Sequence, residues 1–266
     1  MTDNNIGFEE VRLRELSDQE TASYHALWLA MEDEAHPEDP PVPLAVFGAQ
    51  KRSIPSFIEV WCFLARDQEG TVVGAATAGA LTTGENPHAL QVGIRVHPAW
   101  RRRRIGTELL ARLVELAERD GKSLMIGDTT DRVPAGAELC RRAGATAAME
   151  THTNRLELAA LDRSLLADWL EEGPKRAPGY ELIGFDGPCS DDLAGPVAQL
   201  LGVMNDAPRD DLRLDDMHFT VEQLRDFERA DEATGNEHWW ILARELGSGQ
   251  LAGLTDVYWN PAHPET

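Results

Sequence analysis

The chain has 266 residues, of which 46 are acidic and 25 are lysine or arginine, so its formal net charge is −21 at pH 7. Because proteins bind DNA and RNA mainly by neutralising phosphates, this acidic excess argues against a nucleic-acid partner and favours small cationic molecules. The sequence has no apolar run of the ~18 residues that a membrane helix needs and no basic-plus-apolar leader, so we expect neither membrane association nor secretion.

The length and the cysteines indicate a two-domain protein of a reducing compartment. About 100–200 residues is usual for one domain, so 266 residues suggest two. Cys62, Cys140 and Cys189 are odd in number, widely spaced and without a metal-ligand pattern. We therefore expect reduced thiols, a cytoplasmic protein and no metal site.

The first third of the chain is predicted to alternate strands and helices. Residues 8–16 alternate as a strand, and Asp18 is expected to cap the next helix, which carries an apolar stripe. The acidic, proline-rich residues 32–43 predict a loop. Two strands at residues 59–65 and 72–81 are then predicted to form a hairpin.

The next predicted strand, at residues 89–96, leads into a basic turn and an amphipathic helix. Pro98 ends the strand, and between strand and helix stand the four arginines of residues 101–104, followed by Gly106. A helix N-terminus offers unpaired N–H groups and the positive end of the helix dipole, and glycine lets the backbone approach a ligand. Arginine side chains pair well with phosphates. The segment therefore predicts a pyrophosphate site.

The elements that follow complete the first domain and lead out of it. We expect a buried strand at residues 123–127, a short helix at 136–142 that Gly144 ends, and an extended segment at 147–158. A short helix at 161–171 and a Gly/Pro-rich stretch are expected to form a linker over residues 159–178.

The strand, basic turn and helix resemble the acyl-CoA-binding loop of the GNAT acetyltransferase superfamily, in which a strand ending near Val-x-Pro leads into Arg/Gln-x-x-Gly-x-Gly/Ala. Arg101 stands at the first position of that pattern and Gly106 at the last, while Arg104 replaces the middle glycine. The alternative is that residues 101–104 form only a basic surface turn or a nucleic-acid patch. The surrounding element order and the net charge favour the CoA site.

The resemblance covers residues 5–158 and implies the fold and the activity. The predicted order β-α-(α)-β-β-β-α-β-α-β is that of a GNAT domain, an α/β fold with a mixed sheet, expected here over residues 1–158. The family transfers the acetyl group of acetyl-CoA, as co-substrate and without a metal, to a primary amine of a small molecule or peptide. It implies that the backbone of Ile94, Arg95 and Val96 binds the pantetheine arm, and that the pyrophosphate is held by Arg101, Arg102, Arg103, Arg104, Ile105, Gly106 and Thr107.

The groups that would move protons are less evident. Many family members place a tyrosine four residues before the glycine that ends the last helix, and Cys140 stands there; Val133 stands where an asparagine is often found. Cys140 is a candidate acid or a small buried residue. Glu85 and Asp128 are candidate bases or merely solvated carboxylates, and a water chain would serve equally well.

The last third of the chain repeats the first half of this domain at a nearly constant offset. The matching pieces are 61–66 (WCFLAR) with 239–244 (WWILAR), 73–74 (VG) with 252–253 (AG), and 31–33 (MED) with 204–206 (MND). Strands are expected at residues 180–185, 239–245 and 251–259, within a half-domain over residues 179–266. The acidic stretch at 205–232 is predicted to be a solvated helical face.

The second copy has no Arg-x-x-x-x-Gly loop, and the strand that would carry one would begin near residue 266. The protein is expected to be a piece of a longer tandem chain rather than one with a half-domain kept for structure. An edge strand near residues 257–259 would need a partner, which self-association or the first domain would supply. The rival to catalysis is a silent acyl-CoA-binding or interaction module.

Overall fold

The computed structural model describes residues 6–264, so residues 1–5 and 265–266, at the outer ends of the two expected domains, lie outside it. The chain divides into two compact units. The first comprises the chain up to Thr146 together with Arg229–Asn236 and the segment from Trp259 onward, and the second comprises Ala147–Glu228 and Glu237–Tyr258.

The first unit is built on a five-stranded mixed sheet in the order β1-β2-β3-β4-β5. Neighbouring strands are antiparallel except β4 and β5, which are parallel. The strands are β1 (Gly7–Val11), β2 (Ile58–Arg66), β3 (Val72–Leu81), β4 (Ala89–Val96) and β5 (Leu124–Ile126). The bounds predicted for β3 and β4 are confirmed.

The predicted strand at residues 8–16 is too long. β1 ends at Val11, and a 3-10 turn follows at Leu13–Glu15. Leu13 and Leu16 are both buried in the same core, because the turn carries the chain from the edge of the sheet toward the next helix and keeps both leucines inside. Alternating apolar residues therefore continued past the end of the strand.

Helices α1 (Asp18–Ala35) and α2 (Leu44–Arg52) follow, and α1 runs into the region predicted as a loop. Its N-cap is Ser17 rather than the predicted Asp18. The Ser17 hydroxyl accepts a hydrogen bond from the Glu20 backbone N–H, and the Glu20 carboxylate accepts one from the Ser17 N–H, at 3.3 and 2.9 Å. This reciprocal pair satisfies two N–H groups that a helix start otherwise leaves open.

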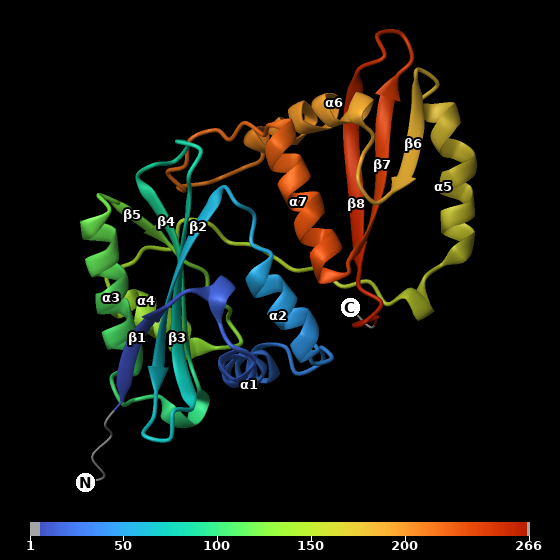
Figure 1. Cartoon of the computed structure of the whole chain (residues 1–266). Helices are drawn as coiled ribbons and strands as arrows, with labels where there is room; N and C mark the ends of the chain where they lie inside the picture. The colour runs from blue at the N-terminus through green and yellow to red at the C-terminus, as the bar shows by residue number, and fades with distance from the viewer. Residues whose placement is uncertain (1–5, 265–266) are drawn as a thin grey trace. The chain divides into compact units, whose positions relative to one another are not determined.

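The two faces of the sheet carry separate apolar cores (Figure 1). The helix α3 (Ile105–Arg119) lies on one face with Ile105, Leu109 and Leu113 fully buried, whereas α1 and α2 lie on the other with Tyr24 and Phe47. Because side chains alternate along β2, Phe63 and Ala65 face α3, and Cys62 and Leu64 face α1.

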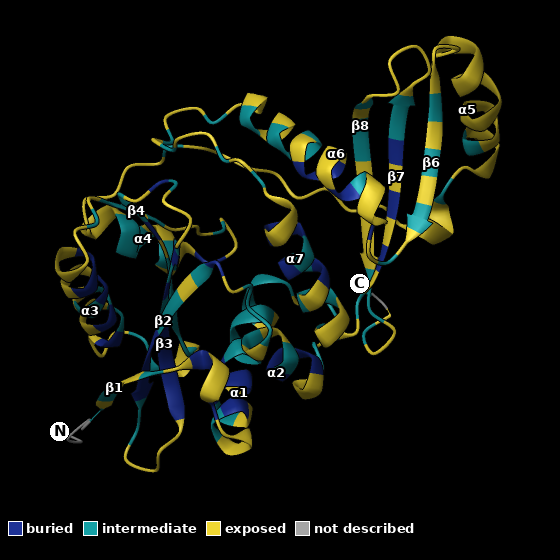
Figure 2. Ribbon diagram, turned by 45° about the horizontal axis from the view of Figure 1, so that its top comes forward, coloured by how far each residue is buried: buried dark blue, intermediate teal, exposed yellow. Residues whose placement is uncertain are grey.

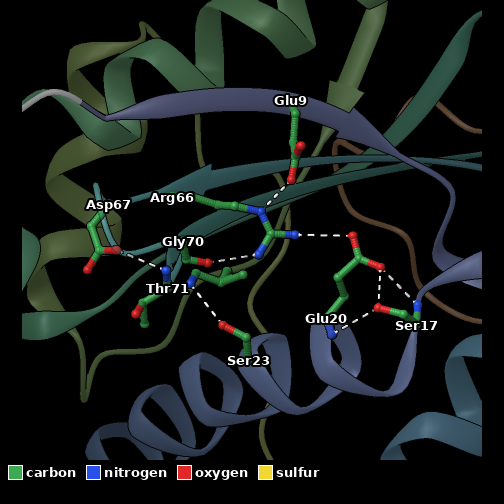
Figure 3. Close-up of polar contacts among 9 residues, drawn as sticks. Glu9, Ser17, Glu20, Ser23, Arg66, Asp67, Gly70 and Thr71 are labelled. Carbon is green, nitrogen blue, oxygen red and sulfur yellow. Dashed lines mark hydrogen bonds and ion pairs between the residues drawn. The ribbon is translucent and has the colours of Figure 1, made fainter.

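Arg66, at the end of β2, joins three elements of the first unit (Figure 3). Its guanidinium donates to Glu9 on β1, to the carbonyl of Gly70 at 3.1 Å and to Glu20 on α1 at 3.5 Å. Only 17% of the Arg66 side chain is exposed. Next to it, the Ser23 hydroxyl accepts from the Val72 N–H at 3.0 Å, which fixes the start of α1 over the start of β3.

β5 is an edge strand in the described part of the chain, which corrects two predictions. The segment at residues 147–158 was expected to be extended, and it forms no strand there. With no neighbour on its outer side, β5 is only partly buried, and Met125 is exposed rather than buried as predicted. The helix predicted at 136–142 is α4 (Pro134–Arg142), with Gly144 in the left-handed conformation after it.

The second unit holds a three-stranded sheet of β6 (Tyr180–Asp186), β7 (Glu237–Glu245) and β8 (Leu251–Trp259), which confirms the three predicted strands. Its small core packs Trp240 and Leu242 against Val197 of α6 (Asp191–Leu201) and Leu224 of α7 (Val221–Thr234). Most residues of α5 (Arg163–Arg176) are exposed (Figure 2).

Two predictions for the second unit need correction. α5 continues through Gly173 and Pro174, where a Gly/Pro loop was expected. Proline removes one N–H and disfavours the helical conformation of the residue before it, so these two residues predicted a helix end. The stretch at 205–232 is not a single solvated helix, because α7 begins only at Val221 and Glu228 is buried.

No helix within residues 6–264 is both long enough and apolar enough to cross a membrane.

Candidate functional site

The turn between β4 and α3 is a compact, strained loop. A single 3-10 turn, Pro98–Trp100, follows β4, and the His97 side chain accepts a hydrogen bond from the Ala99 N–H at 3.2 Å. Arg102 and Arg104 adopt positive φ angles of 65° and 67°. A side chain in that region costs about 1–2 kcal/mol. Arg104, which replaces the middle glycine of the pattern, thus keeps a glycine-like backbone.

Arg101 points away from the open side of the loop and ties it to α1. Its Nη1 donates to Glu34 Oε1 at 2.6 Å, its Nη2 pairs with the other Glu34 oxygen, and its Nε donates to the carbonyl of Val96 at 3.2 Å. The two side chains are 22% and 30% exposed. The guanidinium is therefore already occupied by a carboxylate, and

The remaining arginines of the loop are exposed. Arg102, Arg103 and Arg104 all lie at the surface, and the Arg103 guanidinium lies 4.5 Å from the centre of the Trp100 ring. Trp100 in turn packs against the core beneath α3. The loop thus presents positive charge to solvent beside the start of α3, as expected for one or two of these side chains.

The start of α3 has no side-chain cap. Arg104, its N-cap, provides no hydrogen bond from its side chain, and the first helical hydrogen bond that crosses the boundary is from the Glu108 N–H to the Arg104 carbonyl. Among the described residues, no acceptor is recorded for the N–H groups of Ile105, Gly106 and Thr107. Since α1 is capped on both sides of its first turn, this difference marks the α3 N-terminus as an anion site.

Two glycines seat this helix. A Cβ on Gly74 of β3 would lie 2.8 Å from the Ile105 side chain, so the absence of one lets α3 approach the sheet. A Cβ on Gly106 would meet only Val96 and Leu139, at 3.6 and 3.7 Å, which is ordinary contact. A larger side chain at position 106 would therefore press on β4 and α4 rather than directly on a phosphate, which changes the reason for expecting it to matter.

β4 and β5 diverge beside this helix. Their parallel pairing runs from Ala89–Leu124 to Gln91–Ile126, and Gly127 still lies against the carbonyl of Val92. Beyond that point the described residues provide no strand next to the end of β4. The side chains of Ile94 and Val96 face the α3 core, and Arg95 alternates to the α1 face. The backbone of all three is thus open toward β5.

The candidates for proton transfer are placed unequally. Asp128 is exposed and follows the diverging end of β5. Cys140 is half-buried on α4, one residue after Leu139, which lies near Gly106. Glu85 precedes β4, so the length of that strand, roughly 23 Å, separates it from the loop. Asp128 and Cys140 therefore share the end of the sheet with the loop, and Glu85 does not.

The buried cysteines play no part in proton transfer at neutral pH. Burial raises the pKa of the Cys62 thiol to about 12 and that of Cys189 to about 11. Both thiols stay protonated and behave as small apolar side chains.

Sequence reasoning missed two residues that shape the site. Gly74 was noted only as part of the repeat, although its match to Gly253 was a signal of a close packing contact. Glu34 lies in the stretch read as a loop, and nothing local connects it with Arg101, 67 residues later. Only the tertiary structure brings the end of α1 to the end of β4.

The comparisons with known proteins agree with this geometry. Residues 21–145 match the model of the acetyltransferase (GNAT) family. No curated protein matches the chain. Among solved structures, a tandem GNAT protein from the clavulanic acid biosynthesis pathway, determined without acetyl-CoA, superposes with a TM-score of 0.67 at 22% identity, over 97% of this chain and 75% of that one. This likeness shows the fold.

Further solved structures resemble one unit only. YncA from Salmonella typhimurium, solved with its cofactor acetyl-CoA, has a TM-score of 0.42 at 18% identity over 58% of this chain and 87% of its own. An aminoglycoside acetyltransferase from an uncultured soil metagenomic sample, in complex with sisomicin, has a TM-score of 0.44 at 16% identity over 59% and 99%.

Proposed function

Because residues 21–145 of the chain belong to the acetyltransferase (GNAT) family, we propose that the protein is an N-acetyltransferase that transfers the acetyl group of acetyl-CoA to a primary amine. The observation that carries this proposal is the uncapped start of α3, directly after the end of β4 and beside three exposed arginines. Such a helix start binds a diphosphate through its N–H groups and its dipole.

The residues divide into those that bind and those that position. The N–H groups of Ile105, Gly106 and Thr107 hold the pyrophosphate, with the exposed arginines Arg102, Arg103 and Arg104 around it. The open backbone of residues 94–96 provides hydrogen-bonding groups for the pantetheine amides. Arg101, paired with Glu34, holds the loop in place. This assignment uses every residue of the predicted loop but gives Arg101 a different task.

Acetyl transfer to an ammonium group releases one proton and moves another to sulfur. After one proton leaves the ammonium, the amine nitrogen attacks the thioester carbon, the C–S bond breaks, and the thiolate gains the second proton as the amide forms. Asp128 and ordered water are the candidates for the first transfer, and Cys140 or water for the second. Holding the two reactants together supplies much of the rate, so strong proton donors are not required.

Calorimetry with CoA and a thiol-release assay over a panel of amines test the proposal together. We expect one CoA site per chain, and weaker binding in Gly106→Val because its branched side chain presses on Val96 and Leu139. Gly79→Val, on β3 and away from the loop, is the control. Two sites per chain, or unchanged affinity in Gly106→Val, would contradict the assignment of the loop. Tight CoA binding without turnover of any amine would instead favour a silent acyl-CoA-binding module.

A further inference from the structure

Two cationic side chains lie on the face of the first sheet opposite α3, where α1 and α2 cover it (Figure 1). Arg95 alternates to this face from β4, and its Nη1 lies 3.6 Å from where a Cβ on Gly93 would stand. The guanidinium therefore folds back over Gly93, beside the diverging end of β4 and β5. Lys51 reaches the same face from the last turn of α2, with its Nζ 4.8 Å from the centre of the Phe47 ring.

These two cations are close enough to act on each other. Burial lowers the pKa of Lys51, and the charge of Arg95 lowers it further. Both cations also act on the thiol of Cys62, which lies fully buried between them on β2. Two like charges are thus held together in a half-buried, apolar setting that opposes them.

No carboxylate within residues 6–264 is recorded as pairing with either cation. The other inward-facing arginines of this unit all have acidic partners: Arg66 pairs with Glu9, Arg101 with Glu34 and Arg132 with Glu38. With 46 acidic residues in the chain, a carboxylate for Lys51 and Arg95 would be easy to supply. Unpaired, half-buried cations carry a desolvation cost that an anionic ligand would offset.

Aromatic rings form the wall beside the pair. Phe47 contacts Tyr24, His25 and Trp28, with ring centres 5.4, 5.0 and 5.7 Å away. The His25 ring is fixed by a 2.8 Å hydrogen bond with the Val42 carbonyl, so it is not a free acid or base. This arrangement provides a rigid apolar surface next to two positive charges.

We propose that Lys51 and Arg95 bind the carboxylate of the amine acceptor, so that the substrate is an amino-acid-like amine. The inference rests on the proposed acetyl transfer. A thioester held at α3 reaches the diverging strands from one face, and an acceptor anchored on Arg95 reaches them from the other. A guanidinium binds a carboxylate in a fixed orientation through two hydrogen bonds, which directs the amine toward the thioester. The negative net charge favours a cationic molecule, and an amino acid keeps its ammonium group for that purpose.

The test compares amines that differ only in the carboxylate. The wild-type chain is assayed with glycine against glycinamide and with β-alanine against β-alaninamide, and kcat/KM is measured for each. The amide of each pair is the less basic amine, so more of it is unprotonated, and without recognition the amide would react faster. We expect the acid to be preferred.

Lys51→Gln and Arg95→Gln should each lower kcat/KM for the acid by about 10- to 100-fold, the effect of losing a hydrogen bond to a charged group. Turnover of the amide and the KM for acetyl-CoA should not change. Arg52→Gln, which removes the same charge from the exposed next residue of α2, is the matched control and should behave as wild type. Equal losses for acid and amide, or a wild-type preference for the amide, would overturn the proposal.

Calorimetry separates this proposal from the activity itself. N-acetylglycine and N-acetylglycinamide, titrated into the wild-type chain and both variants, measure carboxylate recognition without turnover. If the wild type turns over no amine, acetyl transfer fails, while binding of N-acetylglycine that both variants lose still supports the carboxylate site. If the variants instead impair turnover of succinyl-CoA with amide acceptors, the carboxylate belongs to the acyl chain and the assignment to the acceptor is wrong.

Discussion

At the scale of single residues, Arg101 shows how a motif residue can be conserved in position and changed in task. The arginine occupies the first position of the CoA pattern, yet its guanidinium faces Glu34 on α1 and the carbonyl of Val96. A carboxylate that already takes two of its donors leaves little for a phosphate. The charge that reaches a ligand comes from the exposed side chains after it.

A double-mutant cycle tests this positioning role. Arg101→Gln and Glu34→Gln should each weaken CoA binding by a similar amount, since either one releases the loop from α1. The double variant should be no worse than either single one, with a coupling energy of about 0.5–3 kcal/mol for two residues in direct contact. If Arg101→Gln weakens CoA binding much more than Glu34→Gln, Arg101 is a phosphate ligand after all. Isothermal titration with CoA measures all three variants.

Cys140 gives the second prediction at this scale. Were its thiol the acid that protonates the departing CoA, Cys140→Ala would depress kcat and leave CoA affinity unchanged, because only a transition-state interaction is lost. We expect a small effect, since the half-buried thiol sits on α4 in the manner of an ordinary packing residue. A loss in kcat beyond about a hundredfold, the low end for general acid catalysis, would show that Cys140 is the acid.

At the scale of elements, the close approach of α3 to β3 depends on Gly74. A Cβ there would lie 2.8 Å from Ile105 Cγ2, and Ile105 is the first residue of α3 and buried. Gly74→Ala should therefore push the helix start away from the sheet, with a stability loss of about 1–3 kcal/mol from overpacking and weaker CoA binding.

Gly79 provides the control on the same strand. A Cβ there would meet its nearest neighbour only at 3.9 Å, so Gly79→Ala should fold and bind CoA as the wild type does. Chemical denaturation and CoA titration of both variants decide the matter. Equal behaviour of the two alanine variants would show that α3 does not need the glycine.

The capping box of α1 predicts how stability responds to pH. The hydrogen bonds from the Ser17 side chain and then from its backbone lower the pKa of Glu20 below its ordinary value of 4.5. A carboxyl whose pKa is lower in the folded state stabilises the fold above its unfolded pKa and loses that contribution as the pH falls through the folded pKa. Ser17→Ala should cost about 1 kcal/mol at neutral pH.

The same substitution should flatten the loss of stability below pH 4.5, because Glu20 then titrates nearer its ordinary value. Urea denaturation of wild type and Ser17→Ala from neutral pH into the acid range measures both effects. An unchanged slope in the variant would mean that other carboxyls dominate the acid response.

At the scale of the whole molecule, the two units differ in how completely they are built. The sheet of the first unit has an apolar core on each face, whereas the second unit has one small core. On the opposite face of β6 and β7, Leu182 and Ile241 are 73% and 47% exposed. A three-stranded sheet covered on one side has little stability to spare.

This difference predicts the behaviour of the second sheet in isolation. Residues 176–266 expressed alone should aggregate or show a broad thermal transition, because one face of the sheet stays apolar and uncovered. Differential scanning calorimetry and sedimentation of that fragment provide the measurement. A sharp, reversible transition of a monomer would contradict the idea that this half-domain needs a partner, in the first domain, in a second copy or in a longer natural chain.

Local pattern by itself determined most of the elements and the candidate loop. The period of two along residues 72–81 and 89–96, the leucines of α3 and the proline before the arginines are short-range signals, so strand, turn and helix followed from neighbouring residues alone. The loop was recognisable because its chemistry is contiguous in the chain.

Only the tertiary structure decided which side chains meet. Glu34 reaches Arg101 because α1 crosses the sheet, and Lys51 and Arg95 share a face because β4 alternates under α2. It also decided that Ser17, not Asp18, caps α1, and that residues 147–158 leave β5 at an edge. Strand pairing and side-chain contact join residues far apart in the chain, and their free energy depends on burial that no local window contains.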